Sequence, residues 1–382
     1  MDKIRNVIVS LSLILSATYV KAQSEIPFSS SGMQLVAKRL IKTGEVIWGF
    51  EFLPDGNILL THRKGELKLF SPKDQIVRTI RGLPPVYAQG QGGLLDIRLH
   101  PKYKENGWIY VSYSVQDNND KSSTRLARFR LKNLRINDFQ ILFTAEPFVQ
   151  SRIHFGSRIL FDAQNFLYLS VGERNERHLA QKLDNHVGKI LRLTDTGKPA
   201  PENPFPSKQY PRAKAEIWTY GHRNPQGLAI QTKTQKIFEQ EHGPQGGDEI
   251  NILKKGANYG WPIVTFGKEY VTGFSIGEGT SKQGIEQPIQ YYAPSIAPCG
   301  LEIYEGNHLK PWRGHVFSGA LALMHLNHIE LNAKNEVIKE ERLLVGKGFR
   351  IRNVKEGPDE YLYFSTDNGD LYQIKLIQHQ RK

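Results

Sequence analysis

The fold is indicated by two short runs, Asn165-Phe166-Leu167-Tyr168-Leu169-Ser170 and Gly188-Lys189-Ile190-Leu191-Arg192-Leu193. Each run begins at a residue that is common in turns and continues as a short apolar or alternating segment, which is typical of a β-strand. Together they predict a turn, a strand, a gap and a second strand. Such a unit is too small to bury a core alone, so its repetition along the chain decides the architecture.

The same unit recurs. It occurs at residues 55–70 and 106–131, and related units begin near Lys236, Gly314 and Glu360. Six units, at a spacing of roughly 50–80 residues, predict an all-β fold: a six-bladed β-propeller of four-stranded antiparallel blades. The last unit contains an Asp367-Asn368-Gly369 hairpin turn.

A sandwich or a pair of β domains is the competing architecture, but no change in composition marks a domain boundary. We therefore expect residues 23–382 to form one propeller domain. In such a fold, loops from several blades meet at one end of a central channel, so residues far apart in the sequence can share a site.

The N-terminal segment differs from the rest of the chain, which has 382 residues, 39% of them hydrophobic and 23% charged. In residues 1–22, basic residues precede an apolar run, residues 7–15, that is followed by Val20-Lys21-Ala22. This pattern predicts a signal peptide cleaved after Ala22. No segment reaches the ~20 apolar residues that a membrane span needs. No cysteine lies near the cleavage point, which argues against a lipid anchor. We expect a soluble protein, secreted across the inner membrane into the periplasm.

The charge and the cysteine content exclude some partners. The net charge is +13, and removal of residues 1–22, with three basic residues and one acidic residue, leaves +11. Such a surplus favours anionic ligands, but the basic residues are scattered and no recognition motif is present, so nucleic acid is not an expected partner. Cys299 is the single cysteine. The protein therefore has no internal disulfide, and without a Cys-x-x-Cys-His motif it cannot attach its own c-type haem.

Residues 240–262 carry the densest chemistry. Gly243-Pro244 followed by two glycines cannot continue a helix or a strand ladder, so backbone carbonyls there point outward. Carbonyls beside Asp248 and Glu249 are ligands that a hard cation prefers. A polar hairpin loop that ends in an aromatic core residue explains the same pattern without a ligand.

Two other loops hold candidate polar residues. In residues 89–96, glycines bring the backbone close to a partner and Gln91 offers both a donor and an acceptor, although a glycine-rich turn between blades is the alternative. His154 precedes Phe155-Gly156 and could act as a general base, because histidine titrates near neutral pH. Glu173 could orient its ring if the two loops meet. A histidine with only structural hydrogen bonds is the alternative.

Three arginines favour an anionic ligand. Arg223 lies between Gly221 and Gly227 and carries a planar fork suited to a carboxylate, although a surface ion pair would also explain it. Alternation along a strand puts Arg350 and Arg352 on one face. The two charges repel by roughly 1 kcal/mol or more unless an anion lies between them. A solvated strand edge is the alternative to a polyanionic ligand.

Six motifs occur in order along the chain: Gly92-Gly93-Leu94-Leu95-Asp96 with His100-Pro101; His154-Phe155-Gly156; Gly221-His222-Arg223-Asn224-Pro225-Gln226-Gly227; Gly243-Pro244 with Asp248-Glu249-Ile250-Asn251; Asn258-Tyr259-Gly260-Trp261-Pro262; and Arg350-Ile351-Arg352. Through these motifs the chain, from about Gln34 to its end, resembles the soluble PQQ-dependent sugar dehydrogenases, specifically the aldose sugar dehydrogenase branch, which are six-bladed propellers.

The resemblance implies calcium-dependent oxidation of the C1 hydroxyl of aldoses to lactones, by proton abstraction and hydride transfer to PQQ. His154 matches the catalytic base, and Arg223 is expected both in catalysis and on the cofactor. The positions that hold PQQ are Gln91, Arg223, Asn224, Tyr270, Arg350 and Arg352. The carbonyls of Gly243 and Pro244 match ligands of the active-site Ca²⁺, and Glu249 with the carbonyl of Tyr259 matches a second, structural Ca²⁺ site.

The chain departs from the family at Ala322, where a lysine commonly reaches the cofactor. Another basic residue such as Lys347 could replace it, PQQ could bind more weakly, or redox activity could be lost. Without its own haem, the protein would pass electrons to a separate acceptor, a quinone or a cytochrome. The sequence indicates neither the preferred aldose nor the oligomeric state.

Two other functions stay open. A calcium-dependent hydrolase of the lactonase type would need the metal and His154, but it leaves Arg350 and Arg352 without a purpose. A non-catalytic propeller that binds carbohydrate or protein is disfavoured by the presence of His154 together with three arginines.

Overall fold

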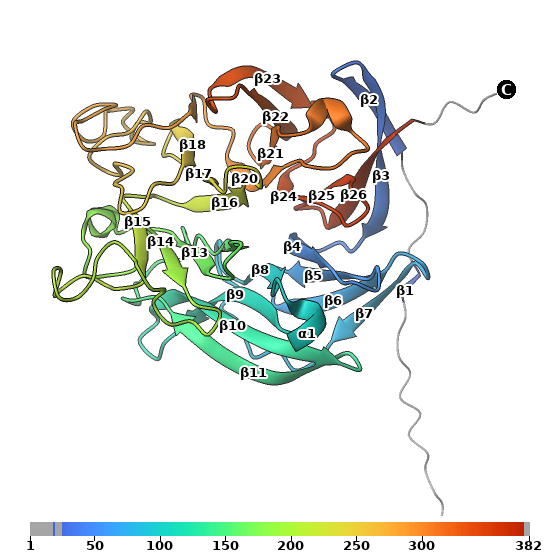
Figure 1. The fold of residues 1–382 in the computed structure, drawn as a ribbon, viewed down its shortest axis with the longest axis horizontal. Coiled ribbons are helices and arrows are strands. Elements are labelled where there is room, and N and C mark those ends of the chain that lie inside the picture. The colour runs from blue at the N-terminus through green and yellow to red at the C-terminus, as the bar shows by residue number, and fades with distance from the viewer. Residues whose placement is uncertain (1–17, 20–24, 378–382) are drawn as a thin grey trace, which may run out of the picture.

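The computed structural model describes residues 18–19 and 25–377. Its strands form six antiparallel sheets arranged in a ring, a six-bladed β-propeller (Figure 1). This confirms the fold predicted from the repeats. The helices are short: α1 (Tyr103–Asn106) and the 3₁₀ segments η1 (Arg177–Gln181) and η2 (Lys310–Trp312). No helix within the described ranges has the length and apolar character to cross a membrane.

Blades one to three are named here from the channel outward. The first contains β4 (Ile47–Phe52), β5 (Ile58–His62), β6 (Glu66–Ser71) and β7 (Ile76–Ile80). The second contains β8 (Leu94–Leu99), β9 (Ile109–Gln116), β10 (Ser122–Lys132) and β11 (Arg135–Thr144). The third contains β12 (Ile159–Phe161), β13 (Leu167–Val171), β14 (Lys189–Leu193) and β15 (Ile217–Tyr220).

Blades four to six complete the ring. The fourth contains β16 (Pro225–Ile230), β17 (Ile237–Glu241), β18 (Asp248–Ile252) and β19 (Gln290–Tyr292). The fifth contains β20 (Pro298–Ile303), β21 (Val316–Ala320), β22 (His325–Leu331) and β23 (Val337–Leu343). The sixth contains β24 (Ile351–Glu356), β25 (Leu362–Thr366), β26 (Asp370–Leu376), β3 (Met33–Lys42) and β2 (Glu25–Ser30).

The sixth blade joins the two ends of the chain. β3 pairs antiparallel with β26, with Leu35 opposite Leu376 and Lys42 opposite Asp370. Because the last C-terminal strand is covered by an N-terminal one, the ring closes without an exposed edge at this point. The sequence repeats did not predict this closure, since β3 belongs to none of the six units.

Each predicted unit corresponds to the second and third strands of one blade. The two runs within residues 165–193 form β13 and β14, which pair from Leu167 opposite Leu193 to Val171 opposite Lys189. The Asp367–Gly369 turn joins β25 to β26, as expected. The first and fourth strands of a blade were not resolved by the repeats, because their apolar pattern is less regular.

Apolar side chains fill the space between neighbouring blades. One cluster joins Val111 of the second blade to Leu59 of the first, and another joins Leu126 of the second blade to Leu191 of the third. These side chains are fully buried. Both faces of most blades are therefore covered, which explains the continuous apolar runs of the inner strands.

The side chain of Arg158 spans the channel and is only 1% exposed. From the third blade it reaches a residue of each of the other five: its guanidinium lies 4.0 Å from the ring of Trp48, and its nitrogens lie 3.4 Å from Asp96 Oδ1, 2.8 Å from the Gln226 carbonyl, 3.4 Å from Cys299 Sγ and 3.0 Å from Asn353 Oδ1. Five donors in one planar group allow this many partners. Arg158 thus separates the two ends of the channel.

The structure describes only two residues of the predicted signal peptide, Thr18 and Tyr19. Thr18–Tyr19 form β1, which pairs with β7 at the edge of the first blade. Residues 1–17 and 20–22 of the predicted signal peptide lie outside the described residues, so cleavage after Ala22 stays a prediction.

Candidate active site

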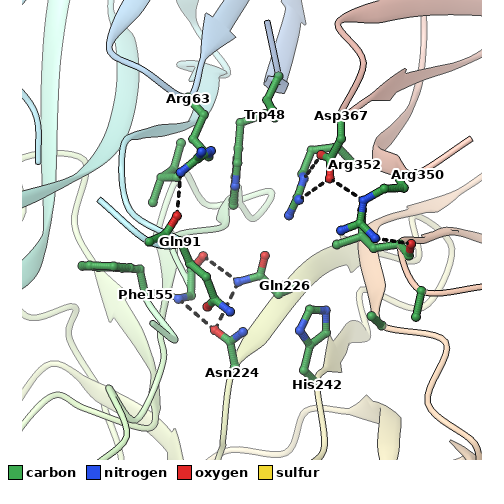
Figure 2. A pocket seen from close by; sticks show the side chains of 17 residues that line it. Trp48, Arg63, Gln91, Phe155, Asn224, Gln226, His242, Arg350, Arg352 and Asp367 are labelled. Carbon is green, nitrogen blue, oxygen red and sulfur yellow. Dashed lines mark hydrogen bonds and ion pairs between the residues drawn. The ribbon is translucent and has the colours of Figure 1, made fainter. Parts of the chain in front are cut away.

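One end of the channel brings together predicted residues from several blades. Because the strands of a blade are antiparallel, the first strand begins at this end and the connection between the second and third strands returns to it. These segments line a pocket of about 410 Å³ (Figure 2). Of the predicted residues, Gln91, Asn224, Arg350 and Arg352 line it.

His154 precedes two residues of the pocket wall, Phe155 and Gly156. Its backbone N–H donates to Gln91 Oε1 at 2.7 Å, and its ring Nδ1 lies 2.5 Å from Glu173 Oε1. His154 is 5% exposed and Glu173 only 1%. The two loops therefore meet, and Glu173 orients the imidazole.

The surroundings keep His154 neutral near pH 7. Burial lowers the pKa of His154, the Arg223 charge lowers it further, and the hydrogen bond to Glu173 acts in the opposite direction. With the proton on Nδ1 donated to Glu173, Nε2 keeps a free lone pair. Among the described residues, none hydrogen-bonds to Nε2, so this nitrogen can accept a proton from a substrate.

The backbone around His154 is unusual. His154 has a φ of 55°, in the left-handed region that few non-glycine residues adopt. The loop packs against Gly172, where an added Cβ would lie 2.1 Å from the His154 carbonyl oxygen and 3.0 Å from Asn224 Oδ1. A glycine at 172 is thus required for this approach. Strained conformations of this kind concentrate at functional sites.

The predicted arginine pair has an internal counter-ion. Arg350 Nε lies 3.1 Å from Asp367 Oδ2, while Arg352 Nε and Nη2 lie 2.8 and 2.9 Å from its two oxygens (Figure 2). Both arginines lower the pKa of Asp367 against the opposing effect of burial. The Asp367 carboxylate therefore relieves the repulsion between Arg350 and Arg352, a role that the sequence pattern suggested for a polyanionic ligand between them. Two guanidinium groups against one carboxylate still leave a positive wall.

Arg223 lies beside the pocket and does not line it. Its Nη1 donates to the carbonyls of His242 at 3.1 Å and Gly243 at 2.5 Å, and its guanidinium lies 5.3 Å from the Trp261 ring. Arg223 Nε is buried without a hydrogen-bond partner. The backbone N–H of Glu173 donates to the Arg223 carbonyl at 2.8 Å. Arg223 is therefore linked to His154 through Glu173.

Asp248 holds the glycine-rich loop in place. Its Oδ1 accepts the Gly243 N–H at 2.9 Å, and its Oδ2 accepts the Ala297 N–H at 2.8 Å and the Ser295 hydroxyl. The carboxylate is fully buried. All of these partners belong to the protein, so Asp248 connects the Gly243 loop to the segment that enters β20. Pro244 is buried next to Gly267 in the same loop.

Glu249 belongs to a buried acidic group. It lies opposite Glu241 in the β17–β18 ladder, and ligand atoms of His222, Glu239 and Glu241 lie within 4.8 Å of one another. The ring of Tyr259 stacks on His222 at 4.8 Å. Burial and the Glu241 charge raise the pKa of both Glu239 and Glu249. Glu239 Oε1 is buried without a partner, so a cation would complete this donor set.

Two further positions named from the sequence, Tyr270 and Lys347, lie outside the pocket wall, and a third, Ala322, lines it without supplying a charge. Tyr270 is 64% exposed and is not part of the pocket wall; its neighbour Glu269 pairs with Arg177 at 2.5 Å. Lys347 is exposed and is also absent from the wall. Ala322 does line the pocket, so the side chain that departs from the family pattern faces the expected place.

The structure adds residues that the motifs did not single out as ligands, namely Trp48, Arg63, Gln226, His242 and Asp367. Arg63 and Asp367 both follow the second strand of a blade, as Glu173 does. Aligning the six units on this connection would have marked them. Burial, with the Arg223 charge, lowers the pKa of His242 to about 3, so this imidazole is neutral. Its Nε2 lies 2.8 Å from the Pro298 carbonyl oxygen.

Sequence comparison gives a family and close relatives. Residues 45–373 match the family model described as glucose/sorbosone dehydrogenase. The chain is 40% identical over 334 residues to aldose sugar dehydrogenase YliI of Escherichia coli, covering 86% of this chain and 89% of that protein. It is 38% identical over 348 residues to an uncharacterised protein of Synechocystis, with 86% and 83% covered.

Solved structures agree in fold. The apo form of the soluble aldose sugar dehydrogenase from E. coli superposes with a TM-score of 0.85 at 38% identity, covering 90% of this chain and all of that one. The PQQ-bound form of an aldose sugar dehydrogenase from Streptomyces coelicolor gives a TM-score of 0.74 at 26% identity, with 93% and 98% covered.

Proposed function

The chain belongs to the glucose/sorbosone dehydrogenase family and is a sugar dehydrogenase, and we propose that it oxidises the C1 hydroxyl of aldoses to lactones with PQQ and Ca²⁺. The observation that carries this proposal is the combination of a buried, neutral His154 imidazole, hydrogen-bonded to Glu173, with a basic pocket next to it. A base alone would serve a hydrolase equally well. The arginine wall is what favours an anionic redox cofactor.

The pocket fits PQQ, a planar quinone with three carboxylates. Three guanidinium groups, from Arg63, Arg350 and Arg352, face one carboxylate from Asp367, so the wall is positive overall. Guanidinium groups bind carboxylates in a bidentate manner. We propose that Gln91, Asn224, Arg350 and Arg352 hold PQQ, with Arg63 supplying the cation that is missing at Ala322. When bound, PQQ supplies the two-electron acceptor.

Arg223 and Tyr270 remain proposed PQQ ligands, but each must move before it can contact the cofactor. Arg223 has a free Nε and lies next to His242, a residue of the pocket wall, so a small side-chain movement would bring it to a ligand. Tyr270 would contact PQQ only after its exposed loop moves toward the pocket.

The proposed Ca²⁺ ligands form two groups, and their oxygen atoms are not equally free to bind a cation. We propose that Glu249, which lies opposite Glu241, and the carbonyl of Tyr259 bind Ca²⁺ next to the group of His222, Glu239 and Glu241, where Glu239 Oε1 has no partner; oxygen-rich sets of this kind bind Ca²⁺. The Gly243 carbonyl already accepts from Arg223, so a cation at Gly243 and Pro244 requires Arg223 to release that oxygen. When bound there, Ca²⁺ would supply Lewis-acid polarisation.

The chain's own residues provide the proton transfer. His154 Nε2 accepts the proton of the C1 hydroxyl, and the positive charge that appears on the ring is stabilised by Glu173 through Nδ1–H. Glu173 in turn is held by its backbone bond to Arg223. Because both side chains are buried, little water reorganisation accompanies the transfer. Electrons then leave to a separate acceptor, a quinone or a cytochrome, in the periplasm.

The test uses protein purified in chelator and then given PQQ, with and without Ca²⁺, while dye reduction is followed with a panel of aldoses. We expect dye reduction with at least one aldose, dependent on both additions. No dye reduction in any combination, together with no saturable PQQ binding, would show that the proposal is wrong.

The same preparation tests the lactonase alternative, because hydrolysis of a lactone releases an acid without reducing the dye. Acid release that depends on Ca²⁺ but not on PQQ would favour the hydrolase. The arginine wall makes that outcome unexpected, since a neutral lactone gains little from it.

A further inference from the structure

The opposite end of the channel contains a second cavity, of about 470 Å³. All six inner strands contribute to it near their final residues, and the remaining walls come from the turns that follow them. This volume lies within the usual range for small-molecule sites of roughly 300–1,000 Å³. Arg158 fills the channel between this cavity and the catalytic pocket, so neither the sugar nor PQQ accounts for it.

The cavity is acidic although the chain is basic. Its charged residues are four carboxylates, Glu51, Glu302, Glu305 and Glu356, and two cations, Arg98 and Lys355. The balance is therefore two negative charges when all six are ionised. On a chain with a net charge of +13, such a concentration is not a consequence of composition.

The cations of the cavity are already engaged. Lys355 pairs with Glu51 Oε2, and Arg98 Nε donates to the Ile159 carbonyl at 3.0 Å and lies 3.9 Å from Asp96 Oδ2. Glu51 is only 8% exposed, so its pair with Lys355 is shielded from water. These contacts leave Glu302 and Glu356 without a cation of their own within an ion-pair distance among the described residues.

Glu302 shows the imbalance most clearly. Burial raises its pKa to about 7, Glu356 adds to this effect, and Arg98 and Lys355 oppose it. The pKa of Glu356 is also raised by burial, although its Oε2 accepts the N–H groups of Glu305 at 2.7 Å and Gly306 at 3.1 Å. A carboxylate in a low-polarity site that lacks a counter-ion is stabilised by any cation that enters.

Apolar side chains form the rest of the wall. Phe52, Leu160, Leu228, Ile230 and Ile303 face the cavity from four of the blades. A bare metal ion would gain nothing from these surfaces. An organic cation would use them, because its carbon chain can be buried there while its charged end meets the carboxylates.

We propose that this cavity binds an organic cation of the alkylammonium class, with the charged nitrogen at Glu302 and Glu356 and the carbon chain against Leu160 and Leu228. The site is independent of the sugar dehydrogenase activity and does not depend on PQQ or Ca²⁺. Its ligand is either a small amine or the side chain of a partner, and the shared chemistry is an ammonium group on an apolar stem.

The experiment is a calorimetric titration of the full chain with putrescine, a diamine, and with the diol of the same length as a neutral control. We expect saturable binding of putrescine and none of the diol. Because the cation binds ionised Glu302 more tightly than the neutral form, affinity should rise about threefold between pH 6 and pH 8, as the ionised fraction rises through a pKa of about 7.

Two variants locate the site. Glu302→Gln should weaken putrescine binding by about fivefold and remove most of its pH dependence. Glu202→Gln removes an exposed carboxylate outside the cavity and should change neither property. Both variants should keep the thermal stability and the PQQ-dependent dye reduction of the parent, which shows that they fold.

Three outcomes would overturn the proposal. These are no saturable heat up to about 10 mM putrescine, binding that Glu302→Gln leaves unaltered, and saturation by Ca²⁺ alone with no response to putrescine. A lysine-containing tripeptide that competes with putrescine would identify the partner side chain as the source; failure of the tripeptide with success of putrescine would identify the free amine.

Discussion

The two ends of the central channel are built from the same six inner strands, yet they carry opposite charge. The catalytic end presents Arg63, Arg350 and Arg352 with a single carboxylate, Asp367. The far end presents four carboxylates and two cations. Because one strand contributes to both ends, with Arg352 and Lys355 both on β24, the difference arises from the few residues at each strand end.

The two ends also differ in how their charges are balanced. At the catalytic end Asp367 binds both arginines directly, at distances from 2.8 to 3.1 Å. At the far end Glu302 has no such partner and its pKa is raised to about 7. A pre-arranged basic end and an uncompensated acidic end are expected to respond differently to substitution, and four measurements test this contrast.

The largest effect is expected at His154. His154→Ala should lower turnover by about 10²–10⁴-fold, because the base next to the pocket is lost. PQQ binding, measured by absorbance titration, should change little, since His154 does not line the pocket. Loss of PQQ binding instead would make His154 a cofactor ligand.

Removal of one arginine comes next. Arg352→Ala should weaken PQQ binding by about 10- to 100-fold, because a bidentate, partly buried partner for a carboxylate disappears. Lys355→Ala, three residues along the same strand but in the far cavity, is the matched control and should leave PQQ affinity unchanged. Equal losses in the two variants would contradict the separation of the two ends.

A smaller effect of opposite sign is expected at Asp367. Asp367→Asn removes the internal counter-ion of the arginine pair, so PQQ should bind about two- to fivefold more tightly at low salt. The gain should shrink as salt screens the charges. Glu302→Gln removes a carboxylate from the other end and should not alter PQQ affinity. Weaker binding in Asp367→Asn would mean that Asp367 mainly positions the arginines.

The smallest effect concerns pH. The neutral form of His154 is the active base, and burial with the Arg223 charge lowers its pKa. Activity is therefore lost only as pH falls through this lowered pKa, so the acid limb of kcat/KM should lie below the ordinary histidine value of about 6.5. Glu173→Gln removes a contact that raises this pKa and should move the limb to still lower pH. An acid limb above pH 6.5 would exclude His154 as the titrating group.

Particular residues show how far the sequence could be read. Gln91, Arg350 and Arg352 were singled out from the residue pattern and Asn224 from the family resemblance, and all four line one pocket. The loops of His154 and Glu173 meet, which is the condition under which Glu173 could orient the ring. Tyr270 was placed with them from family resemblance, but its loop leaves it 64% exposed. Arg63 escaped notice because a lone arginine after a strand carries no motif. Only its position in the repeat distinguishes it.

The sequence by itself determined the six repeated strand pairs, hence the propeller, and the chemistry available in its loops, because both depend on neighbours along the chain. Tertiary structure alone decided which groups face one another: Asp367 between Arg350 and Arg352, Arg158 across the channel, and Glu302 without a counter-ion. Asp367 meets the two arginines through the pairing of β24 with β25 within one blade, whereas the partners of Arg158 lie in different blades, so closure of the ring fixes their distances. Electrostatic interactions depend on those distances and on burial, which no local pattern encodes.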